Sequence, residues 1–164
     1  MTKIKLNKPK KLILLRHGHS PGIVQAGVTS DEQRPLSQTG YAQVKLSAQK
    51  LLALKIDFDV ILSSTLVRAE ETSKILSDIL GVKIMPQKEL SGGLPASAVW
   101  DLIVKRFENF DNILVVGHQP YLGTIAGDLL YGASIGMNTA GFLVLEFKEY
   151  LPFELEQGFA KETS

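Results

Sequence analysis

The chain has 164 residues, 45% of them hydrophobic, and a formal net charge of +1. This length suits one domain with a continuous core, and the balanced charge predicts neither nucleic acid nor an anionic membrane as a partner. The absence of cysteine excludes a disulfide framework, a thiolate zinc site and a cysteine nucleophile, and it favours a cytoplasmic location.

The N-terminus is locally basic, and we expect residues 1–10 to form a solvated basic leader rather than a binding arm. Its lysines are Lys3, Lys5, Lys8, Lys10 and Lys11. No apolar run of signal-peptide length follows them, and no stretch reaches the roughly 20 apolar residues of a membrane span. The sequence therefore predicts no membrane partner.

Unbroken apolar runs alternate with segments of helical length along the chain. Such runs are typical of strands that helices cover on both faces. Strands are expected at residues 12–15, 60–62, 82–85, 113–116 and 141–147. Helices are expected at residues 38–54, 65–80, 96–107 and 121–131. This order predicts a single α/β domain over 1–164, a three-layer α/β/α sandwich with a mostly parallel sheet of about five strands. A polar tail follows at 153–164.

Three of the expected strands end in polar clusters, at residues 16–20, 63–68 and 117–120. In open α/β sheets, ligands bind beyond the carboxyl ends of the strands, so these clusters should meet. They hold all three histidines and two of the four arginines, and Arg34 precedes the first expected helix. Because the planar guanidinium group suits phosphate oxygens, the clusters predict a phosphate site.

The same residues suggest a phosphoryl transfer. A neutral imidazole can accept a phosphoryl group, and the reaction otherwise needs positive charge around the equatorial oxygens. His17 can attack while Arg16, Arg68 and His118 supply the charge. The backbone at Gly18 can approach an anion closely, because glycine has no side chain.

These motifs resemble those of the histidine phosphatase superfamily, which has the phosphoglycerate-mutase-like fold. The motifs, in the family's order, are Arg16-His17-Gly18, Arg34-Pro35-Leu36-Ser37 with Gly40, Ser63-Ser64 with Arg68-Ala69 and Thr72, and Gly117-His118-Gln119-Pro120. The short chain and its Arg-Pro-Leu segment look most like the compact bacterial phosphohistidine phosphatase branch, the SixA type.

The resemblance implies an enzyme that needs neither metal nor cofactor. It implies that His17 becomes phosphorylated, that Arg16, Arg68 and His118 hold the phosphoryl group, and that Arg34 lies at the rim of the pocket. The substrate would be a phosphohistidine protein or a phosphorylated small molecule, and we expect a monomer. The residues do not identify the physiological substrate.

The proton donor is left open by two departures from the family pattern. His19 stands where many members have an acidic residue, and Glu89 matches only loosely the position from which other branches supply an acid. Either residue is a candidate donor. A phosphohistidine substrate would relax the requirement, because its P–N bond is labile, whereas an alkoxide leaving group needs a positioned acid.

Three other interpretations remain at this point. Arg68 could pair with Glu71, three residues on, instead of binding phosphate. His17, His19 and His118 have a metal-like pattern, although neighbouring arginines would repel a cation. A phospho-ligand-binding module with weak catalysis would keep the same fold and arginines.

Overall fold

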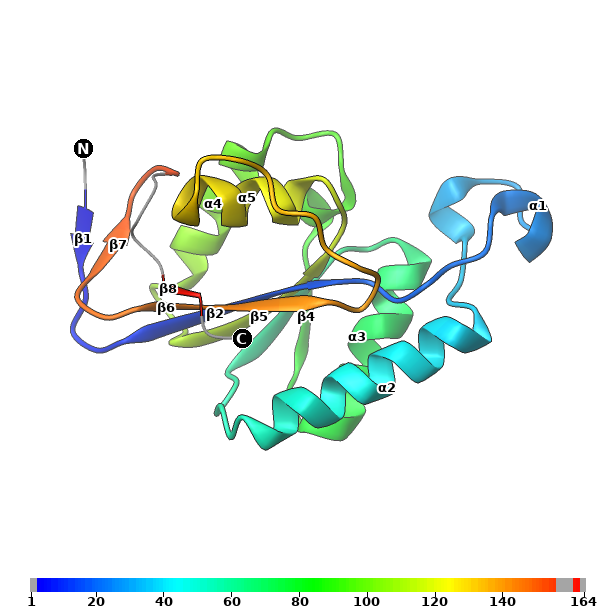
Figure 1. The fold of residues 1–164 in the computed structure, drawn as a ribbon, viewed down its shortest axis with the longest axis horizontal. Coiled ribbons are helices and arrows are strands. Elements are labelled where there is room, and N and C mark those ends of the chain that lie inside the picture. The colour runs from blue at the N-terminus through cyan, green and yellow to red at the C-terminus, as the bar shows by residue number, and fades with distance from the viewer. Residues whose placement is uncertain (1–2, 156–160, 163–164) are drawn as a thin grey trace.

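A six-stranded mixed sheet forms the centre of the molecule. The structure is a computed structural model that describes residues 3–155 and 161–162 (Figure 1). Its strands are β2 (Lys10–Arg16), β3 (Val60–Ser63), β4 (Ile84–Pro86), β5 (Asn112–Gly117), β6 (Phe142–Phe147) and β8 (Lys161–Glu162). Their order is β4-β3-β5-β2-β6-β8; the first four are parallel, and β6 is antiparallel to β2 and β8 to β6. The predicted, mostly parallel sheet of about five strands is confirmed, with the short β8 added at its edge.

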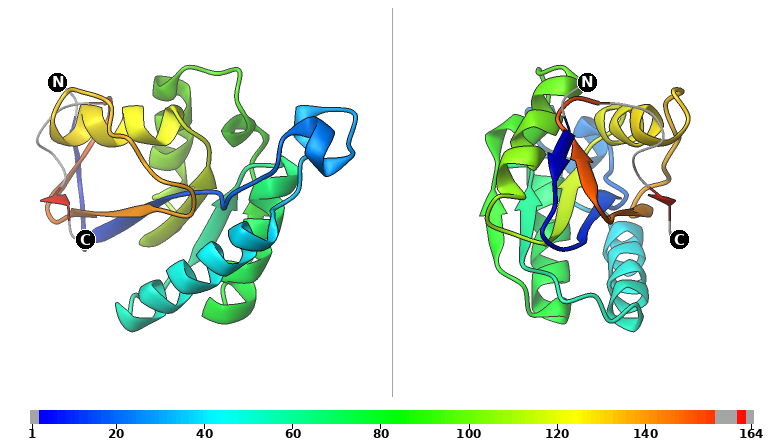
Figure 2. Two further views of the ribbon diagram at one scale, coloured as in Figure 1. Left: turned by 45° about the vertical axis from the view of Figure 1, so that its right-hand side comes forward. Right: turned by 90° about the vertical axis from the view of Figure 1, so that its left-hand side faces the viewer.

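Helices cover both faces of the sheet, as the sequence predicted. They are α2 (Gln38–Ala53), α3 (Val67–Leu80), α4 (Ala96–Arg106) and α5 (Tyr121–Leu130). The pair α2 and α3 lies on one face, and the pair α4 and α5 lies on the other (Figures 1 and 2). None of the helices among the described residues is long and apolar enough to cross a membrane.

Strand β2 shows why the apolar runs are unbroken. Its four apolar side chains, at residues 12–15, enter two separate cores in alternation, and all four are fully buried. Leu12 and Leu14 belong to the core beneath α4 and α5, whereas Ile13 and Leu15 belong to the core beneath α2 and α3. A strand with two buried faces needs apolar residues at every position, so period-2 alternation is lost.

The two ends of the chain form a small ribbon that the sequence did not predict. Strand β1 (Lys3–Lys5) pairs antiparallel with β7 (Tyr150–Pro152). Of the expected basic leader, residues 1–10, the first two lie outside the described part of the chain, Lys3–Lys5 form a paired strand with exposed side chains, and Lys10 already belongs to β2. Of the expected polar tail at 153–164, residues 156–160 and 163–164 lie outside the described part of the chain.

Short helical turns flank the sheet at the carboxyl ends of its parallel strands. These turns are α1 (Ile23–Ala26), η1 (Asp31–Gln33) and η2 (Lys88–Ser91). The first two lie in the connection between β2 and α2, which extends beyond the sheet near the N-terminal end of α2 (Figure 1). This connection carries Arg34 and forms one side of the site.

Candidate active site

The three polar clusters meet in one pocket of about 280 Å³ at the carboxyl ends of β2, β3 and β5. Its lining residues are Arg16, His17, His19, Ser20, Arg34, Arg68, His118, Gln119 and Thr139. The structure therefore brings together every candidate site residue from the sequence except Glu89. Among the described residues, none of those that line the pocket carries a carboxylate.

His17 is held as a neutral imidazole with a free ring nitrogen. Its Nδ1 lies 2.7 Å from the carbonyl oxygen of Gly18. A carbonyl only accepts hydrogen bonds, so Nδ1 carries the proton and Nε2 carries the lone pair. Burial, together with the charges of Arg68 and Arg16, lowers the pKa of His17 to about 4. At neutral pH this imidazole is a competent nucleophile.

Two glycines place the loop of His17 against the start of α2. A Cβ on Gly18 would lie 2.8 Å from Val44 Cγ2, and a Cβ on Gly40 would lie 2.2 Å from the His19 carbonyl oxygen. Neither position has room for a side chain, so both need glycine. The Gly18 amide also donates to Thr72 Oγ1 at 3.1 Å, which ties the loop to α3. The loop can therefore hold His17 in one position.

His118 faces His17 from the end of β5. The two ring centroids are 5.0 Å apart. His118 Nε2 lies 2.7 Å from Ser64 Oγ, whereas its buried Nδ1 has no partner. Burial and the neighbouring charges of His17 and Arg68 lower the pKa of His118 to about 3. Both imidazoles are consequently neutral at physiological pH.

The arginines of the pocket are anchored through only part of their hydrogen-bonding capacity. Arg16 Nη1 donates to the Met137 carbonyl oxygen at 2.8 Å. Arg68 donates from Nη1 to the main-chain oxygen of Asp31 at 2.9 Å and from Nη2 to Asp31 Oδ2 at 3.0 Å. The Nε atoms of both arginines are buried and have no partner among the residues that the structure describes. Buried donors without partners are costly, and an oxyanion could satisfy them.

The alternative pairing of Arg68 with Glu71 is wrong. The Glu71 carboxylate instead accepts from the Leu36 amide at 3.1 Å and from the Tyr41 hydroxyl. Glu71 thereby fixes the chain just before α2 and leaves Arg68 to the pocket and to Asp31.

Arg34 lies at the rim and is half-buried. Its Nε donates to Asp31 Oδ1 at 2.8 Å, and its Nη1 donates to the carbonyl oxygen of Pro21 at 3.0 Å. These bonds hold the connection between β2 and α2 together. They also direct one more guanidinium group to the pocket that contains His17.

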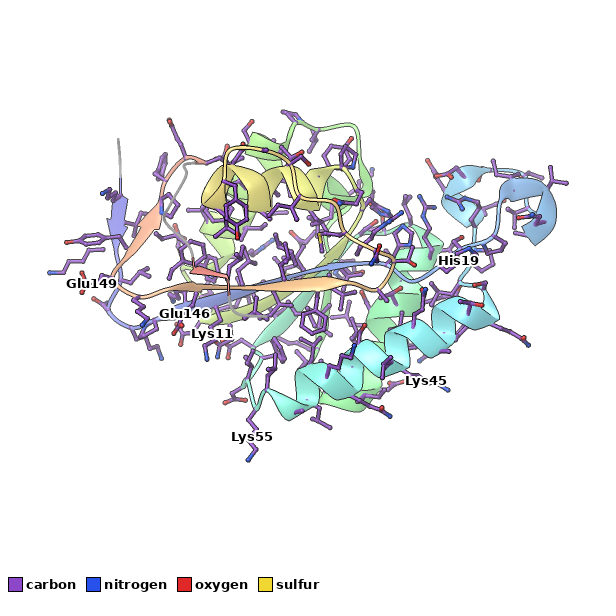
Figure 3. All side chains as sticks on the ribbon, viewed as in Figure 1. Lys11, His19, Lys45, Lys55, Glu146 and Glu149 are labelled. Atoms are coloured by element: carbon purple, nitrogen blue, oxygen red, sulfur yellow. The ribbon has the colours of Figure 1, made fainter. Side chains whose placement is uncertain are left out.

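Of the two candidate proton donors, one lines the pocket and the other lies outside it. His19 is exposed and lies between α1 and α2 (Figure 3). It lines the pocket, and its Nδ1 lies 2.7 Å from Ser37 Oγ. Glu89 is exposed on η2 and does not line the pocket. Its neighbour Ser91 approaches the site instead, with Oγ 3.2 Å from Ser64 Oγ.

Sequence reasoning missed Asp31 and Thr139 as residues of the site or its support, and it assigned no role to Ser20 and Gln119, although both lie in the predicted clusters. Asp31 carried a signal that could have revealed it, because it lies three residues before Arg34 in a turn. Ser64 was expected only to close the turn and cap α3. It does accept from the Leu66 amide at 3.2 Å, but it also contacts His118.

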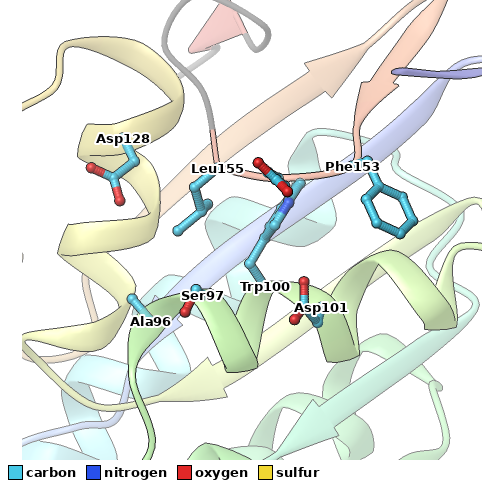
Figure 4. A pocket seen from close by; sticks show the side chains of 8 residues that line it. Ala96, Ser97, Trp100, Asp101, Asp128, Phe153 and Leu155 are labelled. Carbon is cyan, nitrogen blue, oxygen red and sulfur yellow. The ribbon is translucent and has the colours of Figure 1, made fainter. Parts of the chain in front are cut away.

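A larger hollow lies on the other side of the molecule, between α4, α5 and residues 153–155 (Figure 4). Its volume is about 600 Å³, and its charged lining residues are Asp101, Asp128 and Glu154. Three carboxylates with no arginine, lysine or histidine would repel a phosphate group. The smaller, basic pocket is therefore the better anion site.

The histidines do not form a metal site in this structure. Across residues 3–155 and 161–162, no three imidazole or carboxylate side chains converge as metal ligands would. The charges of Arg68 and Arg16 act on both His17 and His118, and they would repel a cation.

The sequence is similar to those of known proteins. Residues 12–91 match the family model for the histidine phosphatase superfamily, branch 1. The phosphohistidine phosphatase SixA of Escherichia coli K12 is 26% identical over 79% of this chain and 80% of its own length. An uncharacterised protein of Picosynechococcus is 29% identical over 82% of this chain and 84% of its own length.

Solved structures share the fold. A SixA structure from Agrobacterium tumefaciens superposes with a TM-score of 0.75 at 22% identity, covering 88% of this chain and 98% of that one. The protein histidine phosphatase SixA complexed with tungstate superposes with a TM-score of 0.74 at 21% identity, covering 89% and 96%. The family match and the SixA relatives support the histidine phosphatase superfamily as the family of this chain. The fold of the chain is that of the compact SixA-type branch.

Proposed function

We propose that this chain is a metal-independent phosphatase that hydrolyses phosphohistidine in proteins through a phospho-His17 intermediate. The observation that carries the proposal is the composition of the pocket. It holds three arginines and two neutral histidines, and no carboxylate lines it. The arginines suit a phosphoryl group, while the absence of a carboxylic acid favours a leaving group that needs little help with its proton.

The first step is attack on phosphorus by His17. Its Nε2 forms the new N–P bond as the bond from phosphorus to the leaving group breaks, and the leaving group takes its proton from solvent or His19. Arg16, Arg68 and the Nδ1 of His118 surround the equatorial oxygens. The Gly18 carbonyl oxygen, 2.7 Å from His17 Nδ1, stabilises the ring as its charge develops.

The second step is hydrolysis of phospho-His17. Water attacks phosphorus, the N–P bond breaks, and the bonding pair returns to Nε2. Inorganic phosphate leaves, and His17 is again neutral with its proton on Nδ1.

The relatives support the substrate class. The Escherichia coli protein is named a phosphohistidine phosphatase, and one superposed SixA structure contains tungstate, an oxyanion of phosphate-like shape. We further propose a monomeric, single-domain enzyme in the cytoplasm. The lack of cysteine supports this location.

The test is a comparison of substrates with one variant as a control. We expect faster release of phosphate from a phosphohistidine protein than from phosphoserine, phosphotyrosine or sugar phosphates, with no release by His17→Ala and no change with EDTA. Preference for a small phosphomonoester would keep the mechanism and reject the substrate. Phosphate binding without any turnover would support the binding module instead.

A further inference from the structure

Asp31 links the two arginines that reach the pocket from different elements. One carboxylate oxygen, Oδ1, accepts from Arg34 Nε at 2.8 Å, and the other, Oδ2, accepts from Arg68 Nη2 at 3.0 Å. The main-chain oxygen of Asp31 also accepts from Arg68 Nη1 at 2.9 Å. Arg68 belongs to α3, whereas Asp31 and Arg34 belong to the connection between β2 and α2.

Asp31 holds Arg68 without filling the space for phosphate. Asp31 is exposed and is not among the residues that line the pocket, whereas Arg34 and Arg68 are. Its bonds occupy the Nη1 and Nη2 end of Arg68, and the buried Nε remains without a partner. The carboxylate therefore lies on the outer side of the guanidinium group.

Without this carboxylate, the two guanidinium groups would repel each other. Burial and the charge of Arg34 both act against the charge of Arg68, whereas Asp31 favours it. The surrounding arginines hold the pKa of Asp31 below its usual value, so it stays ionised and cannot serve as a proton donor at neutral pH. Its effect on the reaction must come through the arginines.

We infer that Asp31 is a positioning residue, whose carboxylate fixes Arg68 and Arg34 relative to each other so that they bind the phosphoryl group as one unit. This inference rests on the proposed phosphatase function and adds a determinant of phosphate affinity to it. The turn η1 makes the arrangement possible, because the Arg34 amide bonds to the Asp31 carbonyl oxygen at 3.2 Å and brings both side chains to one side.

The experiment measures the Kd of inorganic phosphate by calorimetry and the KM for a phosphohistidine protein. We expect Asp31→Ala to raise the Kd and the KM about tenfold each, which is within the range of interaction energies measured between residues in contact. Asp31→Asn should have a smaller effect, because its amide oxygen can still accept from one arginine. In the Arg68→Ala background, Asp31→Ala should change the Kd less than about threefold, because only Arg34 remains to be held.

Glu32→Ala is the matched control, since Glu32 lies next in the same turn and is exposed. It should leave Kd and KM unchanged, and all variants should keep the wild-type melting temperature within a few degrees. An equal effect of Asp31→Ala with and without Arg68, no effect, or tighter phosphate binding would overturn the inference. Tighter binding would mean that the carboxylate competes with phosphate.

The binding measurement separates this inference from the proposed function. A wild-type protein that binds phosphate but releases none from any substrate would reject the phosphatase, while the variants would still test Asp31. Turnover by the wild type without coupling between Asp31 and Arg68 would reject only the inference. A wild-type protein that binds no phosphate would reject the arginine unit itself.

Discussion

The two ends of the central sheet use positive charge in different ways. At the amino end of β5, Asp111 pairs with Lys8 at 2.6 Å and with Lys10 at 2.5 Å. Lys10 also donates to the carbonyl oxygens of Phe107 and Phe110 at 3.0 and 3.1 Å. At the carboxyl end, the arginines keep buried donors without partners. The lysines at the amino end stabilise the fold through their bonds, whereas the arginines at the carboxyl end keep hydrogen-bond donors available for a ligand.

Removal of the nucleophile should have the largest effect at the carboxyl end. We expect His17→Ala to lower kcat by about 10⁴-fold or more, since loss of a covalent route removes the main reaction path. Phosphate affinity should fall only slightly, because the arginines remain. The measurements are single-turnover phosphate release and phosphate calorimetry. Retention of normal turnover by this variant would contradict the mechanism.

Glu89→Gln is the control for that experiment. Glu89 is an exposed carboxylate outside the pocket, and its substitution should leave kcat unchanged. A large loss of kcat in Glu89→Gln, with a matching loss of the basic limb of the pH profile, would restore Glu89 as the proton donor.

The two neutral histidines at the carboxyl end of the sheet should make the free energy of unfolding depend on pH. In the folded state, the pKa is about 4 for His17 and about 3 for His118, below the ordinary histidine value of 6.5 that applies to the unfolded chain. Between these values the unfolded chain binds more protons. Stability should therefore fall as the pH drops from 6.5 toward 4, by about 1.4 kcal/mol per pH unit for each histidine.

Urea unfolding at several pH values between 7 and 4.5 measures this dependence. In His118→Gln one titrating group is gone, so the slope of unfolding free energy against pH should be roughly halved. A slope equal to that of the wild type would show that His118 is not buried as a neutral ring.

Lys10→Met should reveal the structural use of charge at the opposite end. The Lys10 side chain is only 13% exposed, and its substitution leaves three acceptors without their donor. We expect unfolding free energy to fall by about 2 kcal/mol, with phosphate affinity unchanged.

Lys8→Met is the matched control, because Lys8 pairs with the same Asp111 but is 68% exposed. Its substitution should cost much less stability than Lys10→Met, because solvent screens an exposed ion pair. Altered phosphate affinity in Lys10→Met would contradict the conclusion that charge at the amino end serves the structure alone.

The sequence predicted the sheet and its covering helices because local patterns encode both. A buried strand such as β2 needs apolar residues on both faces, and this requirement appears directly as a run. The ribbon of β1 and β7 was missed because each strand has three residues and the pairing joins segments about 150 residues apart. Such long-range pairing leaves no local pattern.

For the candidate site too, the sequence predicted some features and missed others. Arg16, His17, Arg68 and His118 follow strand ends, so topology alone predicts that they meet. The contacts that orient them are different, because they depend on side-chain directions in three dimensions. The bond between Ser64 and His118 joins residues 54 positions apart, and the ion pair of Arg68 with Asp31 joins residues 37 apart. Neither separation is a regular helical or strand spacing.

Ser64→Ala should produce the smallest of these effects and tests how His118 is oriented. Ser64 Oγ accepts from the Leu66 amide, so its own proton is available to His118 Nε2, which would place the imidazole proton on Nδ1 toward the phosphate. Loss of this bond should lower kcat/KM about tenfold, the equivalent of one hydrogen bond. Ser91→Ala, which removes a contact of Ser64 but none of His118, should have a weaker effect. Nitrogen-15 NMR of the wild type should find His118 protonated on Nδ1, and a proton on Nε2 would mean that Ser64 accepts from His118 and that the phosphate meets a ring lone pair instead of a donor.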